Sequence, residues 1–177
     1  ARVRVPRWPR GHCGTEIDKN RANAILILAL LIREMNCGKM LQPLWISGGE
    51  KDNAIPTSAE MVLCVNEYER FEICRAFDSA ERKLLATLRR QEPDLAFTLE
   101  ETEDGGEHMI REGSYRVMSP ASFEKVLDFL LLVPFGVSAM SEEPKGLVET
   151  SNNVGIIRTV GDTVVVGSSV RGTIALR

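Results

Sequence analysis

Residues 24–32 form an unbroken run of nine apolar side chains, and this run limits the possible folds more than any other feature of the chain. A membrane-spanning helix needs about 20 apolar residues, so the run predicts a helix inside a globular core instead. The spacing of Ile25, Leu28 and Ile32 is helical and predicts a helix over residues 15–36, with Thr15 or Asp18 as its cap. The helix carries more apolar surface than one core-facing stripe needs. We therefore expect one of its faces, or the strand beside it, to pack against a second copy or another domain.

The composition indicates an ordinary globular domain. The chain has 177 residues, 44% hydrophobic and 27% charged, which suits a single domain spanning residues 1–177. The 22 Lys and Arg residues against 25 Asp and Glu residues give a net charge of −3, which excludes a globally basic nucleic-acid binder. The first eight residues lack the apolar segment of a signal peptide, so we expect a cytoplasmic protein without membrane contact. Because the chain opens directly in a strand-like run, we expect an excised domain rather than a whole gene product.

The cysteines and histidines argue against a self-contained metal site. The four cysteines contain no C-x-x-C pair, and the two histidines, His12 and His108, belong to no H-x-D or H-E-x-x-H motif. The chain also lacks the G-x-S-x-G, P-loop and G-x-G-x-x-G motifs. We therefore expect neither a metal nor another cofactor in this chain. As a free-standing enzyme it looks incomplete.

The order of the remaining elements predicts an α+β fold. We expect a ferredoxin-like βαββαβ sandwich, in which helices cover one face of an antiparallel sheet, extended by an inserted helix and a C-terminal hairpin. Ser119 and Pro120 are typical of a helix N-cap and first turn. The expected strands are residues 2–8, 41–47, 55–65, 94–102, 147–158 and 163–176, the further helices are 66–91 and 119–132, and the loops include 100–113 and 137–144.

Three polar residues are candidates for chemistry. His12 lies in a Gly-flanked turn before a helix, where it could donate a hydrogen bond to a developing oxyanion or simply pack in the turn. Asn53 stands at the start of a strand, where its amide could bind a ligand or cap the turn. Arg171 precedes Gly172 in the last strand, where its guanidinium could clamp a carboxylate or lie exposed at the edge. Residue types and spacing alone leave each pair of alternatives open.

The sequence around these residues resembles one enzyme family. Four blocks in the same order are similar to blocks of bacterial aminoacyl-histidine dipeptidases, the cytosolic non-specific, carnosine-cleaving members of the co-catalytic zinc peptidase clan. The family patterns are G-H-S-G with G-R-G-N-A, G-G with R-N-A-I-P, K-G-V-V-E-T-S-x-N-V-G, and the strand of the lid arginine. The corresponding residues here are 11–14 with 20–24, 48–49 with 53–56, 145–155, and 168–171; Cys13 stands where the family has Ser.

The resemblance implies a role for each candidate residue. It covers only the lid or dimerisation domain that interrupts the catalytic domain of such enzymes, so two zinc ions with their ligands would belong to a catalytic domain absent from this chain. His12 would correspond to the lid histidine that stabilises the tetrahedral oxyanion. Asn53 and Arg171 would correspond to lid residues that hold the carboxylate end of a dipeptide substrate.

Two functions therefore remain in view. The first is the lid domain of a zinc dipeptidase that hydrolyses Xaa-His-type dipeptides. It would be active only beside its own catalytic domain, and we expect it to form a homodimer. The second is a free-standing ferredoxin-like module for oligomerisation or small-molecule binding. An H-x-D motif encoded before Ala1 and a histidine encoded after Arg177 would decide for the first. A stop codon just after Arg177 would favour the second.

Overall fold

The computed structural model describes residues 1–6, 17–19, 21–35, 41–102, 110–111, 114–143 and 145–172. Its helices are α2 (Ala24–Met35), α3 (Arg70–Leu88) and α4 (Pro120–Leu132), with short 3-10 turns at η1 (Ile17–Lys19) and η2 (Glu67–Glu69). Its strands are β1 (Arg2–Val5), β2 (Gln42–Gly48), β3 (Ala59–Cys64), β4 (Thr98–Glu100), β5 (Ile110–Arg111), β6 (Ser114–Tyr115), β7 (Gly136–Met140), β8 (Val148–Val160) and β9 (Thr163–Gly172).

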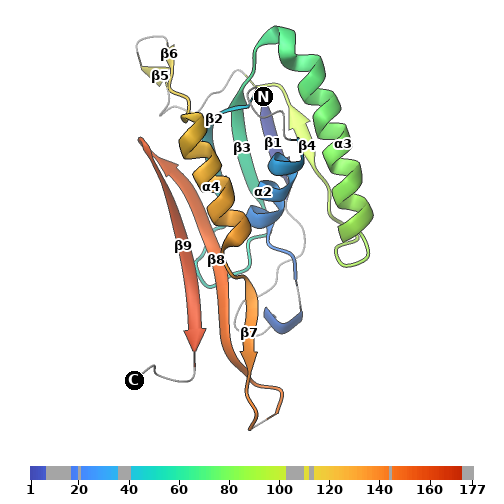
Figure 1. Cartoon of the computed structure of the whole chain (residues 1–177), viewed down its shortest axis with the longest axis vertical. Coiled ribbons are helices and arrows are strands. Elements are labelled where there is room, and N and C mark those ends of the chain that lie inside the picture. Colours follow the sequence, from blue (N-terminus) through green and yellow to red (C-terminus); the bar gives the residue numbers. More distant parts are fainter. Residues whose placement is uncertain are drawn as a thin grey trace.

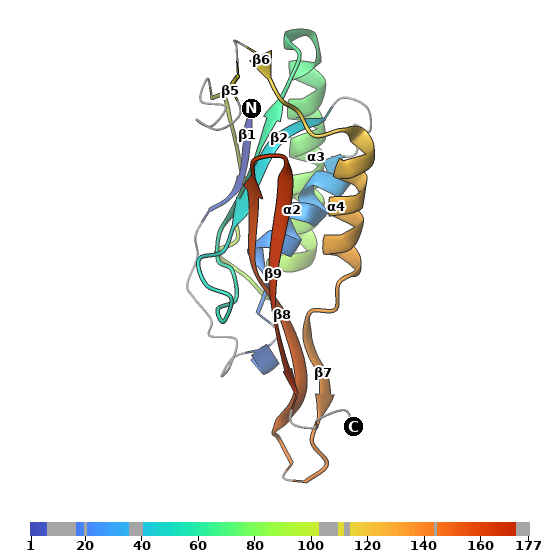
Figure 2. The same cartoon turned by 90° about the vertical axis from the view of Figure 1, so that its left-hand side faces the viewer.

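Seven of these strands form one antiparallel sheet, in the order β4-β1-β3-β2-β8-β7 with β9 also paired to β8. The first four strands of the sheet, taken along the chain, lie in the spatial order 4-1-3-2, which confirms the expected ferredoxin-like unit. The three helices cover one face of the sheet, and the other face carries none of them (Figures 1 and 2). The expected α+β class is therefore correct.

Helix α2 is the centre of the core, because it contacts both α3 and α4 as well as the sheet. Eight of its side chains are buried, and each aliphatic one contributes about 1.5–3 kcal/mol by leaving water. Within the apolar run of residues 24–32, only Leu30 is exposed, at 39%. The apolar surface that suggested a partner for this helix is thus covered within the chain itself, and the expectation of a partner for the strand beside it stays a prediction. A helix between two others and a sheet needs apolar side chains around most of its circumference.

Helix α2 begins later than the sequence pattern indicates. The side-chain Oδ1 of Asn23 accepts hydrogen bonds from the backbone amides of Ile25 and Leu26, at 2.9 and 3.3 Å, and so caps the helix. Residues 17–19 form a separate 3-10 turn, so neither Thr15 nor Asp18 is the cap of α2. Ala24 donates its amide hydrogen to the carbonyl of Pro56, which ties the first turn to a distant segment.

Several other boundaries also differ from expectation. The strand expected over residues 94–102 is limited to β4, the helix expected over 66–91 divides into η2 and α3, and the loop expected over 100–113 contains β5. Residues 137–144, expected as a loop, contain most of β7, which pairs with the beginning of β8. The strand expected from residue 55 begins at Ala59, because Pro56 has no amide hydrogen and Ile55 packs with Ile17 in a second, smaller apolar cluster. By contrast, Ser119 caps α4, and Pro120 is in its first turn, as expected.

Strand β8 has 13 residues and pairs with three other strands of the sheet, β2, β7 and β9. One of its edges pairs with β9 over residues 150–160. Its other edge pairs with β7 over residues 148–152 and with β2 only at residues 157–158. On that second edge, a gap of a few residues separates the two partner strands. The candidate site is built at this gap.

Candidate functional site

The turn that carries Asn53 fills the gap beside β8. Asn53 is exposed, and the amide of Ala54 donates to the carbonyl of Lys51 across the turn. The side-chain Nδ2 of Asn153, on β8, donates to the carbonyls of Asp52 and Ala54 at 3.2 and 2.9 Å. These two carbonyls belong to the residues on either side of Asn53. One buried amide thus fastens the turn at both flanks of the candidate residue.

Two glycines let the backbone of this segment touch β8 directly. Gly49 has φ +72°, and a side-chain carbon placed on it would lie 1.9 Å from the carbonyl oxygen of Gly155. A side-chain carbon on Gly155 would lie 2.4 Å from the carbonyl oxygen of Asp52. Every residue other than glycine would therefore clash with backbone at either position. The guanidinium of Arg158 adds a further link, because it donates to the Gly49 carbonyl at 2.8 Å.

Arg171 lies on the same face of the sheet as this turn. In the β8–β9 register, Asn153 is opposite Ser169 and Ser151 is opposite Arg171. Side chains directly opposite each other in an antiparallel pair share a face, and so do residues two apart on one strand. Asn153 and Arg171 therefore point to one side, about 7 Å apart along the strand direction. It is the side away from the helices, where the β2–β3 connection runs in Figure 2.

The guanidinium of Arg171 is available for a ligand. The residue is exposed, and its side chain makes no ion pair or hydrogen bond with any residue that the structure describes. A guanidinium offers two parallel N–H donors that match a carboxylate. An exposed asparagine and an arginine that has no partner among the described residues lie on one face, and their side chains are chemically suited to a small anion such as the carboxyl group of a peptide.

A cavity of about 470 Å³ adjoins the turn on the helix-free face. Its lining includes Gly49, Glu50 and Arg158 from the β2–β3 and β8 side, and Arg4 and Glu60 from the β1–β3 side. Arg4 is paired with Glu60 at 2.6 Å, so these two charges compensate each other. The cavity makes the helix-free face concave and polar at Gly49 and Glu50, and neither Asn53 nor Arg171 lines it.

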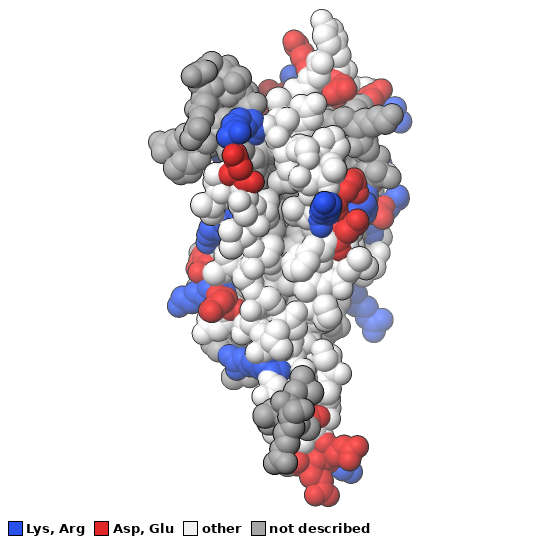
Figure 3. All heavy atoms as spheres, turned by 60° about the vertical axis from the view of Figure 1, so that its left-hand side comes forward, with Lys and Arg blue, Asp and Glu red and all other residues white. Residues whose placement is uncertain are grey.

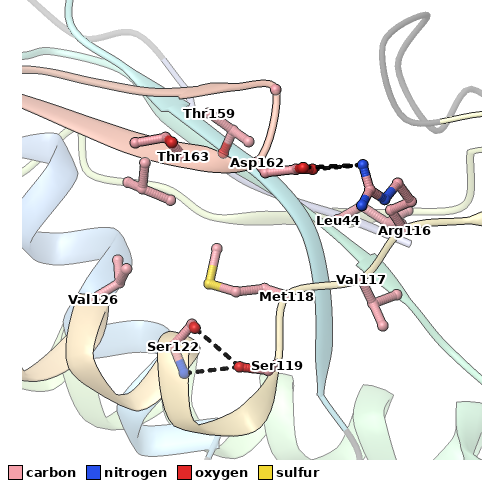
Figure 4. Close-up of a pocket in the computed structure, with 12 residues that line it drawn as sticks. Leu44, Arg116, Val117, Met118, Ser119, Ser122, Val126, Thr159, Asp162 and Thr163 are labelled. Atoms are coloured by element: carbon pink, nitrogen blue, oxygen red, sulfur yellow. Dashed lines mark hydrogen bonds and ion pairs between the residues drawn. The ribbon is translucent and has the colours of Figure 1, made fainter.

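A second cavity, of about 460 Å³, lies between the start of α4 and the β8–β9 turn (Figure 4). Arg116 closes its rim through an ion pair of 2.9 Å with Asp162, and Ser119 and Ser122 bond to each other. Asp162 and Arg171 are at opposite ends of β9, about 30 Å apart along the strand. This cavity is therefore separate from the face that carries Asn53 and Arg171.

The structure brings together two of the three predicted site residues. Asn53 and Arg171 lie on one face of the sheet, whereas His12 lies outside the described residues. The sequence analysis assigned no role to Asn23 and Asn153, which are 2% exposed each. Asn23 donates its Nδ2 hydrogen to the carbonyl of Val154 at 2.8 Å, so both asparagines fasten segments to the same stretch of β8. Both asparagines lie inside the sequence blocks that resemble the dipeptidase family, and this position is the signal that could have identified them.

The described part of the chain shows no arrangement suited to a metal ion. No three His, Cys, Asp or Glu side chains among its residues come together as a set of ligands. No helix within it is long and apolar enough to cross a bilayer.

Comparisons with known proteins connect the chain to dipeptidases. No protein-family model matches the chain. Over 93% of its length it is 26% identical to the cytosol non-specific dipeptidase of Escherichia coli strain K12. Its fold superposes on the crystal structure of an aminoacylhistidine dipeptidase from Vibrio alginolyticus with a TM-score of 0.81, at 26% identity and over 98% of this chain.

The chain spans about a third of the length of these relatives, 32% of the first and 34% of the second. It is therefore homologous to one part of a dipeptidase. The predicted resemblance to aminoacyl-histidine dipeptidases is confirmed, and so is its restriction to a part of such a protein.

Proposed function

We propose that this chain is the lid and dimerisation domain of a zinc-dependent cytoplasmic dipeptidase that hydrolyses Xaa-His-type dipeptides. One observation carries the proposal: Asn53 and Arg171, which are far apart in sequence, lie on the same helix-free face of the sheet. The similarity of the whole chain to a third of two dipeptidases supports it. The remaining two thirds of such an enzyme would carry the chemistry that this chain lacks.

The substrate end of the proposed mechanism follows from the side chains. The terminal carboxylate of a dipeptide is planar and anionic, and the Arg171 guanidinium would bind it through two parallel hydrogen bonds. The Asn53 amide would donate a further hydrogen bond and fix the orientation of the carboxylate. Recognition of a free carboxylate favours cleavage of dipeptides over cleavage inside longer chains.

The reacting end depends on His12 and on the catalytic domain. In the proposal, His12 donates a hydrogen bond to the oxygen that becomes negative as the peptide carbonyl is attacked. Zinc in the catalytic domain would activate the attacking water, but no described residue of this chain forms a site for it. Delivering His12 and Arg171 from a separate domain would complete the site only on closure, which excludes bulk water.

We also propose that the chain forms a homodimer through β9. The outer edge of β9 pairs with no strand in the described part of the chain, and residues 163–170 contain no charge, proline or other feature that blocks pairing. Val170 on β9 and Leu132 on α4 are 71% and 81% exposed. Figure 3 shows few charged atoms over this side of the molecule.

A second copy fits this edge better than an unrelated strand would, because the pattern is self-complementary. Antiparallel pairing of two β9 strands centred on Gly167 would place each Arg171 opposite Thr163, so no like charges would meet. The two-fold axis would also bring the exposed apolar residues of α4 near their counterparts.

Steady-state kinetics of the full-length enzyme test the proposed function. Because Arg171 would hold the carboxylate in ground and transition states alike, Arg171→Ala should mainly raise KM. Arg171→Lys should restore only part of the loss, since a point charge cannot reproduce the bidentate fork. An unchanged KM in Arg171→Ala would overturn the assignment of Arg171 to the substrate carboxylate.

A further inference from the structure

We propose that Asn153 is a positioning residue, which sets the place of Asn53 relative to Arg171 and thereby the affinity for the substrate carboxylate. The inference rests on the proposed function for its kinetic consequence. Its structural part, that Asn153 holds the Asn53 turn, can be tested without any substrate.

The contacts of Asn153 define the turn from both sides. Both hydrogens of its Nδ2 are used, one for the carbonyl of Asp52 at 3.2 Å and one for the carbonyl of Ala54 at 2.9 Å. Because the donors of one planar amide have a fixed angle, the two carbonyls cannot shift independently. The residue between them, Asn53, is exposed yet held at both flanking peptide groups.

Asn153 is itself held in the register that contains Arg171. It pairs with Ser169, two residues from Arg171, and its carbonyl accepts a hydrogen bond from the Ser168 hydroxyl at 3.3 Å. Its side chain is buried at 2% exposure, so the amide has little freedom of its own. Asn53 and Arg171 are thus connected through the side chain of Asn153 and through the pairing of β8 with β9.

Substitution by aspartate removes the donors with little change of shape. The Oδ1 atom of Asn153 is buried and accepts no hydrogen bond from any described residue, so an aspartate forfeits no known acceptor contact. In place of the amide group it presents a carboxylate oxygen to two carbonyl oxygens. Oxygens that face each other without a hydrogen repel, so the turn should leave β8.

The neighbouring Asn152 provides a matched control. Its side chain points to the opposite face, where Nδ2 donates to the carbonyl of Pro134 and Oδ1 accepts from Ser168. Asn152→Asp therefore introduces the same chemical change one residue away, without a contact to residues 52–54. A second variant, Asn153→Ser, removes the paired donors without placing a charge in the interior.

Hydrogen exchange of the chain tests the structural part. The amides of Ala54 and Gly49 are bonded to Lys51 and Ser58 within the β2–β3 connection. They should lose protection in Asn153→Asp and Asn153→Ser, while amides of α2 and β3 keep theirs and Asn152→Asp keeps both. Unchanged protection of Ala54 and Gly49 in both Asn153 variants would overturn the inference. Loss across the whole chain in both variants would also overturn it, because Asn153 would then be a general stability residue.

Kinetics of the full-length enzyme test the functional part with a readout that a purely structural role would not move. For a dipeptide with a free carboxylate, Asn153→Asp should raise KM about tenfold, with kcat nearly unchanged. The corresponding dipeptide amide lacks the carboxylate charge. For this substrate, the KM of Asn153→Asp should stay near the KM of the unmodified enzyme. Equal losses for both substrates would overturn the inference.

A double-substitution cycle separates this inference from the proposed function. If Asn153 acts through Asn53, then adding Asn153→Asp to Asn53→Ala should cause little further loss. Additive losses would show that Asn153 does not act through Asn53. If Asn53→Ala and Arg171→Ala both leave KM unchanged, the proposed function fails, while the exchange experiment still decides whether Asn153 holds the turn.

Discussion

Gly49 and Gly155 touch through their backbones, so that a side-chain carbon on Gly49 would lie 1.9 Å from the Gly155 carbonyl oxygen. The contact joins the end of β2 to the middle of β8, which are more than 100 residues apart in sequence. It lets the β2–β3 connection lie flat on the helix-free face. The geometry of the Asn53 turn depends on this close approach.

Gly155→Ala should therefore destabilise the fold strongly. The added carbon would meet the Asp52 backbone at 2.4–2.7 Å, and backbone cannot move aside as a flexible side chain does. We expect a loss of about 2–4 kcal/mol in the free energy of unfolding, at the upper end for a small-to-large change. Gly167→Ala on the paired strand is the control, since its nearest neighbour would be 3.5 Å away. Urea denaturation of both variants measures the difference, and equal stabilities would contradict the interpretation.

Asn23→Ala should cost about 2–3 kcal/mol of stability. The substitution removes the cap of α2 and leaves the buried Val154 carbonyl without its donor from Asn23. Asn66→Ala is a suitable comparison, because Asn66 caps the exposed turn η2 and makes one hydrogen bond of 3.1 Å to Tyr68. That variant should lose less than about 1 kcal/mol. Thermal or urea unfolding tests the order, and a larger effect at Asn66 would refute it.

His12→Ala in the full-length enzyme should lower kcat by about 10²–10³, the effect of removing one oxyanion donor. The expected loss falls on kcat because the charge on the oxygen develops only in the transition state. Zinc content, measured in parallel by elemental analysis, should stay constant, since His12 is not assigned as a ligand. An unaltered kcat would return His12 to the role of a turn residue that packs.

The isolated 177 residues should neither bind zinc stoichiometrically nor hydrolyse a dipeptide. The reason is chemical: the two histidines lie 96 positions apart, and no C-x-x-C or H-x-D motif accompanies them. Metal analysis after dialysis, together with an assay on an Xaa-His dipeptide, checks both statements. One tightly held zinc per chain with turnover would contradict the assignment of the active metal site to another domain.

Val165→Lys should weaken the proposed homodimer. Val165 is 49% exposed on β9, and pairing of two copies about Gly167 would place it two residues from the two-fold axis. A lysine there would place a charge on the paired edge strand and leave it partly desolvated in the dimer. Light scattering and sedimentation should show a shift toward monomer in this variant but not in Val117→Lys, a 41% exposed position before α4. A strict monomer in the unmodified chain would exclude β9 as a dimer surface.

Much of the fold could be predicted from the chain itself because the signals are local. The apolar run of residues 24–32 indicates a buried helix, and Ser119 with Pro120 marks the start of α4. The Gly161-Asp162 turn between two apolar runs predicts the β8–β9 hairpin, which the structure contains. These patterns depend on periodicity and turn chemistry within about twenty residues, so they need no knowledge of distant partners.

The tertiary structure decided everything that depends on distant segments. Strand β7 has only weak alternation of its own and becomes a strand through pairing with β8. Helix α2 begins at Ala24 because Asn23 caps it while bonding to Val154, 131 residues away. Likewise, no spacing in the sequence shows that Asn53 and Arg171 share one face. Their common face follows from the β8–β9 register and from the bonds of Asn153 to the turn, and both form only when β8 has paired with its neighbours in the folded sheet.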